Sequence, residues 1–123
     1  MNALWIGLFG LAGVFSRYFV DQLLPRTPGV FPTGTFAINI VGSFLAGAIY
    51  VWGFERNLVS PELRTGILVG FLGGFTTFSA FSLQAATLVE GRLLGTAVLY
   101  AVLSPLAGII AALAGLKTVR ALL

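Results

Sequence analysis

The sequence has no cysteine and no histidine, and its 123 residues include only four carboxylates. The missing cysteines exclude disulfide bonds and thiolate metal sites, and the missing histidines remove the usual general base near neutral pH. No nucleophile–base pair or metal-ligand cluster is therefore expected, so the sequence predicts that the chain is not an enzyme. The carboxylates are scattered along the chain at Asp21, Glu55, Glu62 and Glu90.

Charge is also scarce: 9% of the residues are charged, whereas 58% are hydrophobic and the mean hydropathy is +1.00. A soluble domain of this size needs far more polar surface than this composition provides. The seven basic residues are scattered and form no patch, which argues against nucleic-acid binding. The composition instead predicts one domain, residues 1–123, embedded in a lipid bilayer.

Four stretches are apolar and long enough to cross a bilayer as helices, which takes about 20 residues. Proline, glycine and charged residues separate them, as is typical of turns. No basic segment precedes the first stretch, so we interpret it as a retained helix, not a cleaved signal peptide. The sequence predicts an all-α membrane protein with four transmembrane helices, at residues 2–23, 34–54, 63–88 and 93–116.

The basic residues that flank the four spans are nearly balanced between the two sides of the membrane. A weak bias permits insertion in both orientations, and hence an antiparallel dimer, but a modest bias can also fix a single orientation. Both interpretations stay open at this point. The side with the two termini carries Arg56, Arg64, Lys117 and Arg120, and the other side carries Arg26 and Arg92, with Arg17 near the end of the first span.

Polar residues inside the spans are candidates for function, because polar groups are costly in hydrocarbon. Thr35, Asn39 and Ser43 recur every four residues and so share one face of the second span. Asn39 offers two donors and an acceptor, and interhelical hydrogen bonding is its alternative role. Tyr100 and Ser104 share a face of the fourth span in the same way.

The third span contains signals for both close packing and interruption. Gly70 and Gly74 belong to a stripe of small residues that lets two backbones approach closely. Gly73 and Gly74 are followed by Thr76 and Thr77, which predicts a break near mid-membrane. Backbone groups freed at such a break can hold a cation through carbonyls or an anion through N–H groups.

Phe78 and Phe81 follow the predicted break and share one helix face, with Ser79 on an adjacent face. Membrane phenylalanines usually face lipid or pack against other helices. Their ring edges are electropositive, however, and so can hold a small anion without a full positive charge. Such weak binding suits conduction, which requires that an ion leave as readily as it enters.

Three segments together resemble the Fluc/CrcB family of small fluoride channels, and the resemblance covers nearly the whole chain. The third-span segment GFLGGFTTFSAFS (70–82) follows the family signature almost residue for residue. The segments PTGTFAINIVGSF (32–44) and GVFSRY (13–18) are similar to the family patterns of the second and first spans. Ala80 departs from the family, because many relatives carry threonine there, and the missing hydroxyl predicts slower or differently tuned conduction.

The resemblance implies a fluoride-selective channel for passive export from the cytoplasm, in the plasma membrane of a bacterium or archaeon. It implies a dual-topology antiparallel homodimer with two pores. It also implies a structural sodium ion at the dimer centre, held by the carbonyls of Gly73 and Thr76 from both subunits. The residues it assigns to the fluoride pore are Asn39, Phe78, Phe81, Ser79, Thr35, Tyr100 and Ser104. Arg17 matches a family arginine, for which a structural and a vestibular role both stay open. The stripe of small residues independently predicts structural roles for Gly70 and Gly74.

Two other functions compete with this interpretation. A small proton-coupled multidrug exporter also has four spans and about this length, but it needs a titratable carboxylate deep in the membrane. Asp21 is the nearest candidate, and it lies at the end of the first span. The other competitor is a membrane assembly subunit that transports nothing. The sequence has no ATP-binding motif or Walker lysine, so any transport is expected to be passive.

Overall fold

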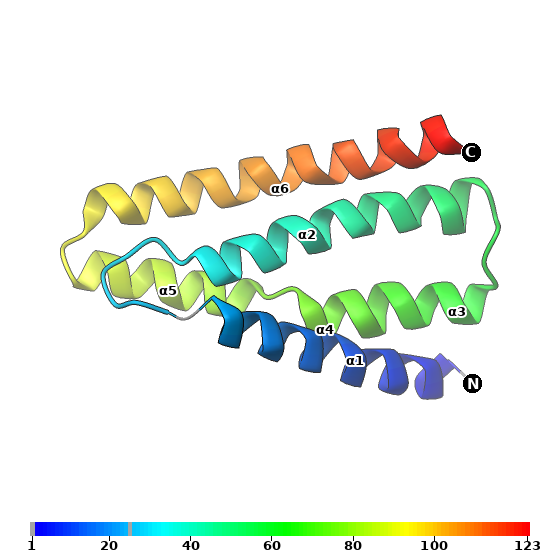
Figure 1. Ribbon diagram of the computed structural model, residues 1–123, viewed down its shortest axis with the longest axis horizontal. Helices are drawn as coiled ribbons and strands as arrows, with labels where there is room; N and C mark the ends of the chain where they lie inside the picture. Colours follow the sequence, from blue (N-terminus) through cyan, green and yellow to red (C-terminus); the bar gives the residue numbers. More distant parts are fainter. Residues whose placement is uncertain (1, 25) are drawn as a thin grey trace.

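The computed structural model describes residues 2–24 and 26–123, and its chain runs back and forth through four long helical segments (Figure 1). Both termini lie at the same end of the bundle. The segments long and apolar enough to cross a membrane are Asn2–Leu23, Thr33–Glu55, Pro61–Glu90 and Leu94–Leu122. The predicted all-helical fold with four spans is therefore confirmed. The fourth helix continues past the predicted end at residue 116.

Two of the four spans are single α-helices, and the other two change helix type along their length. The first span is α1 (Asn2–Leu23) and the fourth is α6 (Leu94–Leu122). The second is α2 (Thr33–Tyr50), which continues as the π-helix η1 (Val51–Glu55). The third consists of α3 (Pro61–Thr65), the π-helix η2 (Gly66–Leu72), α4 (Gly73–Phe75) and α5 (Phe78–Glu90).

The start of the third span follows ordinary helix-capping chemistry. The Ser60 hydroxyl accepts a hydrogen bond from the Leu63 backbone N–H at 3.3 Å, and Pro61 is the first helical residue. Proline suits this position because its missing N–H has no helical partner there. Glu62 in the first turn also interacts favourably with the helix dipole. The third span therefore begins at Pro61, two residues before the apolar stretch predicted from the sequence.

Two residues with extended backbone separate α4 from α5. Thr76 has φ −81° and ψ 158°, and Thr77 has φ −151° and ψ 117°. The Thr77 hydroxyl then caps α5 by accepting a hydrogen bond from the Ala80 N–H at 3.2 Å. A threonine at this position favours a new helix start, because its side chain satisfies a backbone donor that would otherwise be unpaired. We call Thr76 and Thr77 the interruption.

Glycines let α2 and α6 pack side by side at very short range. A Cβ added at Gly47 would collide with the carbonyl of Ala112, and one added at Gly115 would collide with the carbonyl of Phe44. The two backbones are therefore too close for any side chain at these positions. This is the packing expected of membrane helices, where close contact between backbones replaces the hydrophobic effect.

The predicted stripe of small residues in the third span packs against α1 of the same chain. A Cβ at Gly70 would lie 2.6 Å from the Ile6 carbonyl oxygen, and one at Gly74 would lie 2.8 Å from the Gly10 carbonyl oxygen. The two structural glycines predicted from the sequence thus hold the third span against the first. This contact fixes the position of the interruption relative to α1.

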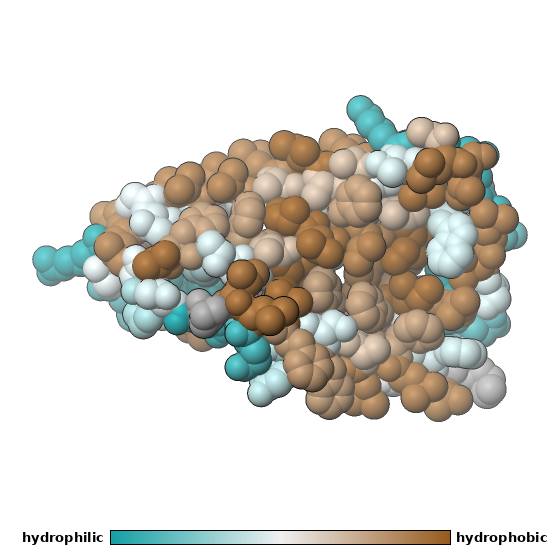
Figure 2. All heavy atoms as spheres, viewed as in Figure 1, coloured by the Kyte–Doolittle hydropathy of each residue, from teal (hydrophilic) through white to brown (hydrophobic). Residues whose placement is uncertain are grey.

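The outer surface of the bundle is apolar. Figure 2 shows hydrophobic residues over most of the visible face, with most hydrophilic residues toward the two ends. Large apolar side chains such as Leu8 on α1 and Leu99 and Ile110 on α6 are exposed. A hydrophobic band with polar ends matches the cross-section of a bilayer.

Candidate functional site

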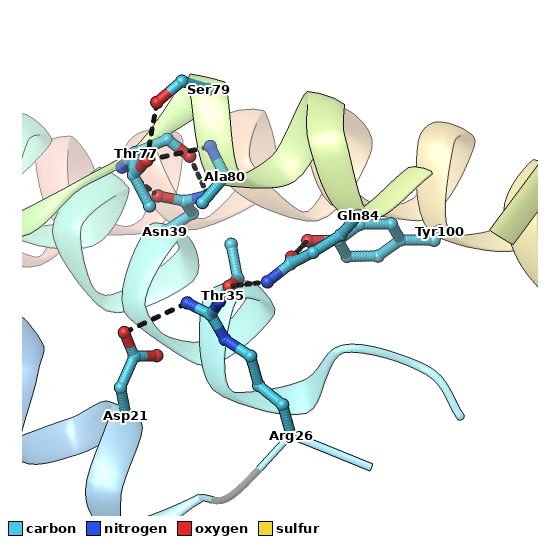
Figure 3. Close-up of polar contacts among 9 residues, drawn as sticks. All are labelled: Asp21, Arg26, Thr35, Asn39, Thr77, Ser79, Ala80, Gln84 and Tyr100. Atoms are coloured by element: carbon cyan, nitrogen blue, oxygen red, sulfur yellow. Dashed lines mark hydrogen bonds and ion pairs between the residues drawn. The ribbon is translucent and has the colours of Figure 1, made fainter. Parts of the chain in front are cut away.

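Asn39 of α2 pairs with the backbone of the interruption. Its Nδ2 donates to the Thr77 carbonyl oxygen at 3.0 Å, and its Oδ1 accepts from the Thr77 N–H at 2.8 Å (Figure 3). The extended backbone of Thr77 has no helical partners, so one amide side chain satisfies both of its backbone groups. Asn39 therefore joins α2 to the third span, and its second amide N–H is not used in this pair.

The same hydrogen bonds divert the usual donors away from the carbonyls of Gly73 and Thr76. In an α-helix, each carbonyl accepts from the N–H four residues later. For Gly73 that donor is Thr77, whose N–H instead donates to Asn39. For Thr76 it is Ala80, whose N–H instead donates to the Thr77 hydroxyl. Both carbonyls are left with free acceptor capacity, and oxygen donors of this kind fit a hard cation such as sodium.

A groove of about 550 Å³ lies beside the interruption, between α2, α5 and α6. The Ser104 hydroxyl is buried and has no hydrogen-bond partner among the residues that the structure describes. A buried hydroxyl without a partner is costly unless something else occupies it. The polar and aromatic residues that line this groove are Asn39, Ser43, Thr76, Thr77, Phe78, Phe81 and Ser104.

Phe78 and Phe81 both line the groove, but they differ in burial. Their ring centroids are 5.9 Å apart at an interplanar angle of 41°. Phe78 is 79% exposed, whereas Phe81 is half-buried and packs against Tyr100, with ring centroids 4.9 Å apart. Phe81 thus lies between the groove and the interior, and Phe78 stands at the surface of the chain.

A second set of polar side chains joins three helices beside Phe81. The Tyr100 hydroxyl donates to Gln84 Oε1 at 2.7 Å, and Gln84 Nε2 donates to Thr35 Oγ1 at 2.8 Å (Figure 3). Tyr100 is fully buried and Thr35 is 2% exposed. We call Thr35, Gln84 and Tyr100 the polar relay. It links α2, α5 and α6 at the level where Phe81 meets Tyr100.

Gln84 was not among the site residues predicted from the sequence. It lies inside the apolar stretch 63–88, so an amide there carried the same signal as Asn39. It also lies three residues after Phe81 and therefore on the same helix face. These two signals were sufficient to find it.

A second cavity of about 380 Å³ lies at the end of the bundle opposite the termini. The loop between α1 and α2 forms one wall and α5 forms the other. Gln84 lines this cavity, and it is linked through Tyr100 to Phe81, which lines the groove. A chain of contacts through Gln84, Tyr100 and Phe81 thus connects the second cavity to the groove.

The remaining predicted residues lie around these features. Ser79 is exposed beside Phe78, and its Oγ is 3.5 Å from the Thr77 hydroxyl. Ser43 donates to the carbonyl of Asn39 at 2.7 Å, so it bonds within its own helix. Arg17 is half-buried on α1 and does not line either cavity.

The fold and the site define a small multi-pass membrane protein in which polar side chains line a groove between otherwise apolar helices. The sequence model of the family described as "CrcB-like protein, Camphor Resistance (CrcB)" matches residues 4–116. The chain belongs to this family.

Several curated relatives carry the name fluoride-specific ion channel FluC. The relative from Geotalea daltonii is 46% identical over 95 residues, which is 76% of this chain and 77% of the relative. That from Hahella chejuensis is 39% identical over 123 residues, 99% of this chain and 97% of the relative. That from Novosphingobium aromaticivorans is 43% identical over 94% of both chains. These names agree with both predictions from the sequence, that the chain is a channel and that it is not an enzyme.

Proposed function

We propose that this chain is a passive, fluoride-selective channel. The observation that carries the proposal is the groove beside the interruption, where hydrogen-bond donors and phenylalanine rings meet and no charged side chain lines the wall. A fixed cation would hold an anion too tightly to release it, whereas neutral donors and ring edges allow rapid passage. The fluoride-channel names of the relatives support the same function.

The pathway we propose runs through the groove, past Phe81, and along the polar relay. In the groove, the unused amide N–H of Asn39 and the unpartnered hydroxyl of Ser104 replace part of the water around fluoride. Ring edges of Phe78 and Phe81 add weak electropositive contacts. On the far side of Phe81, the Tyr100 hydroxyl turns its proton from Gln84 toward the ion and binds it in turn. Chloride is larger, so a passage that fits a dehydrated fluoride ion excludes chloride by size.

We further propose that two copies of the chain form an antiparallel homodimer with two pores. Beside the interruption, Phe78 and Ser79 are exposed and Gly73 has open space around it, so this surface can accept a second copy. The carbonyls of Gly73 and Thr76 lie in the same region, and their usual helical donors bond to other groups. Such carbonyls from both subunits would hold a structural sodium ion where the third spans, each interrupted near mid-membrane, meet.

The biological role that follows is fluoride export across the plasma membrane of a bacterium or archaeon. Fluoride enters cells as the neutral acid and dissociates inside, so a passive anion pathway lets it leave. The alternative of a proton-coupled exporter requires a carboxylate deep in the membrane. Asp21 instead lies at the end of α1 and pairs with Arg26 at 3.3 Å, which favours the channel.

The test of function is efflux from liposomes loaded with potassium fluoride and started by the potassium carrier valinomycin. We expect rapid fluoride efflux with no proton gradient, and chloride efflux at the background rate. Phe78→Ile and Asn39→Ala should each lower fluoride efflux roughly tenfold or more, because about 1.4 kcal/mol of lost stabilisation of the passing ion is a factor of ten.

Phe19→Ile is the matched control, since Phe19 is also exposed, on α1, but does not line the groove. Its fluoride efflux should equal that of the wild type. Unchanged efflux in both Phe78→Ile and Asn39→Ala would remove the proposed pore. Transport that needs a proton gradient and is abolished by Asp21→Asn would favour the exporter instead.

Dual topology is tested separately by cysteine labelling, because the chain has no cysteine of its own. Leu58→Cys and Leu123→Cys place an exposed thiol in the α2–α3 loop and at the C-terminus. We expect an impermeant maleimide to label each position from both faces of the membrane. Labelling from one face only would contradict the antiparallel dimer.

A further inference from the structure

The second cavity has a charged rim, unlike the groove. Arg26 lines it, and its side chain is 59% exposed. Arg26 Nη2 donates to Asp21 Oδ2 at 3.3 Å, and Asp21 is 23% exposed (Figure 3). The other Asp21 oxygen, Oδ1, is buried and has no hydrogen-bond partner among the described residues. Among the residues that line either cavity, Arg26 is the one with a charge.

The wall of this cavity leads to the polar relay. Thr27, Thr33 and Thr87 line the cavity, and Gln84 lines it on α5. The amide of Gln84 donates to Thr35 and accepts from Tyr100. An anion that enters between the loop and α5 therefore passes the Arg26 guanidinium first and reaches neutral hydrogen-bonding groups next.

We propose that the second cavity is the mouth of the pathway and that Arg26 raises the local concentration of small anions there. The negative charge of Asp21 partly cancels this attraction. The proposal rests on the proposed function and adds a residue that sets how fast fluoride arrives. A positive charge at a narrow entrance with apolar walls attracts anions, and this attraction falls as salt screens it. The partial exposure of the ion pair leaves the charge of Arg26 accessible from the water.

Substitutions of Arg26 and Asp21 should change the rate of fluoride efflux in opposite directions. Arg26→Gln removes the attracting charge, so fluoride efflux at low ionic strength should fall roughly two- to fivefold, as for one unit charge about 4–10 Å from the ion in water. Asp21→Asn keeps the shape of the side chain and removes the opposing charge, so efflux should rise by a similar factor. Arg26→Lys keeps the charge and should stay near the wild type.

The experiment measures fluoride efflux from liposomes at about 10 mM fluoride, with and without about 1 M of an inert salt of a large anion on both sides. The screening length is about 30 Å at 0.01 M and about 3 Å at 1 M. At high salt, all variants should converge on the wild-type rate. Arg92→Gln is the matched control. Arg92 lies in the short α5–α6 connection, at the same end of the bundle, but does not line the cavity.

The outcomes separate this inference from the proposed function. Fluoride efflux by the wild type with the same salt dependence in Arg26→Gln and Arg92→Gln would overturn the role of Arg26 and leave the channel standing. A loss in both Arg26→Gln and Arg26→Lys that persists at high salt would show a structural role for the loop, which also overturns it. No fluoride efflux by the wild type would remove the proposed function itself.

Discussion

The helix contacts and the interruption are held together by different means. Where α2 meets α6, Gly47 and Gly115 bring the two backbones into direct contact. At the interruption, Asn39 alone satisfies both backbone groups of Thr77. The contacts tolerate no added atom, whereas the interruption depends on hydrogen bonds that a single substitution removes. We infer that the glycine contacts build the scaffold and that the interruption carries the proposed function.

The largest effect is expected from adding volume at a helix contact. In Gly115→Val the new side chain would collide with the Phe44 carbonyl, so the two helices must separate. Overpacking usually costs about 1–3 kcal/mol, but here the added atoms meet backbone that cannot shift aside, so a cost of about 5 kcal/mol or more is expected. We expect aggregated protein, measured by size-exclusion chromatography in detergent, or a large loss of thermal stability, measured as the fraction that still elutes as folded protein after heating.

Gly95→Val is the control on the same helix, because a Cβ at Gly95 meets no atom within 4 Å. It should elute with the wild type and melt within a few degrees of it. Equal behaviour of the two variants would contradict the packing described for α2 and α6.

The next effect in size is expected from Asn39→Ala. The substitution removes two hydrogen bonds and leaves the Thr77 N–H and carbonyl without partners, at about 1–3 kcal/mol for each buried group. We therefore expect a loss of about 2–4 kcal/mol in the free energy of unfolding, measured by denaturant titration in micelles. A change below about 0.5 kcal/mol would mean that the interruption does not depend on Asn39.

A smaller effect is expected from Tyr100→Phe, which removes the hydroxyl that donates to Gln84. Leaving the Gln84 carbonyl unpaired should cost about 1–2 kcal/mol and lower fluoride efflux, because the relay loses a donor. Tyr18→Phe is the control, since Tyr18 is exposed on α1. A drop in efflux as large for Tyr18→Phe would show that the relay is not the cause.

The smallest effect is expected from Ser43→Ala. The Ser43 hydroxyl bonds to the Asn39 carbonyl one turn earlier in the same helix, and such local bonds contribute little to stability. Melting temperature and fluoride efflux should both stay close to the wild-type values. A large loss of efflux in a normally folded Ser43→Ala variant would place this hydroxyl in the pathway and sharpen the description of the groove.

The spans were predictable because hydrophobicity and length decide them, and the start at Pro61 because capping is local. The end of α6 was not predictable in this way. Lys117 ends the apolar run, but a helix needs no apolar residues to continue. Arg120 on its last turns donates to Glu55, with Nε 2.9 Å from Oε2. That ion pair joins residues 65 positions apart, and no local pattern indicates it.

The candidate site was predictable in part. The four-residue spacing of Thr35 and Asn39 correctly placed them on one face, which meets the third span. The pairing of Asn39 with Thr77 was foreseen only as a general alternative, because its partner is backbone and backbone groups carry no sequence signal. Gln84 was missed because it was treated as part of an apolar run. The unequal burial of Phe78 and Phe81 depends on tertiary packing, which helix periodicity does not give.

The most direct test of the central claim is the fluoride efflux rate per reconstituted protein for Phe81→Ile beside Phe19→Ile. Phe81 contacts both Phe78 and Tyr100, so an ion that moves between the groove and the relay must pass it. The account predicts that Phe81→Ile elutes as folded protein and loses roughly tenfold or more in fluoride efflux, while Phe19→Ile keeps the wild-type rate. Wild-type efflux through folded Phe81→Ile would contradict it.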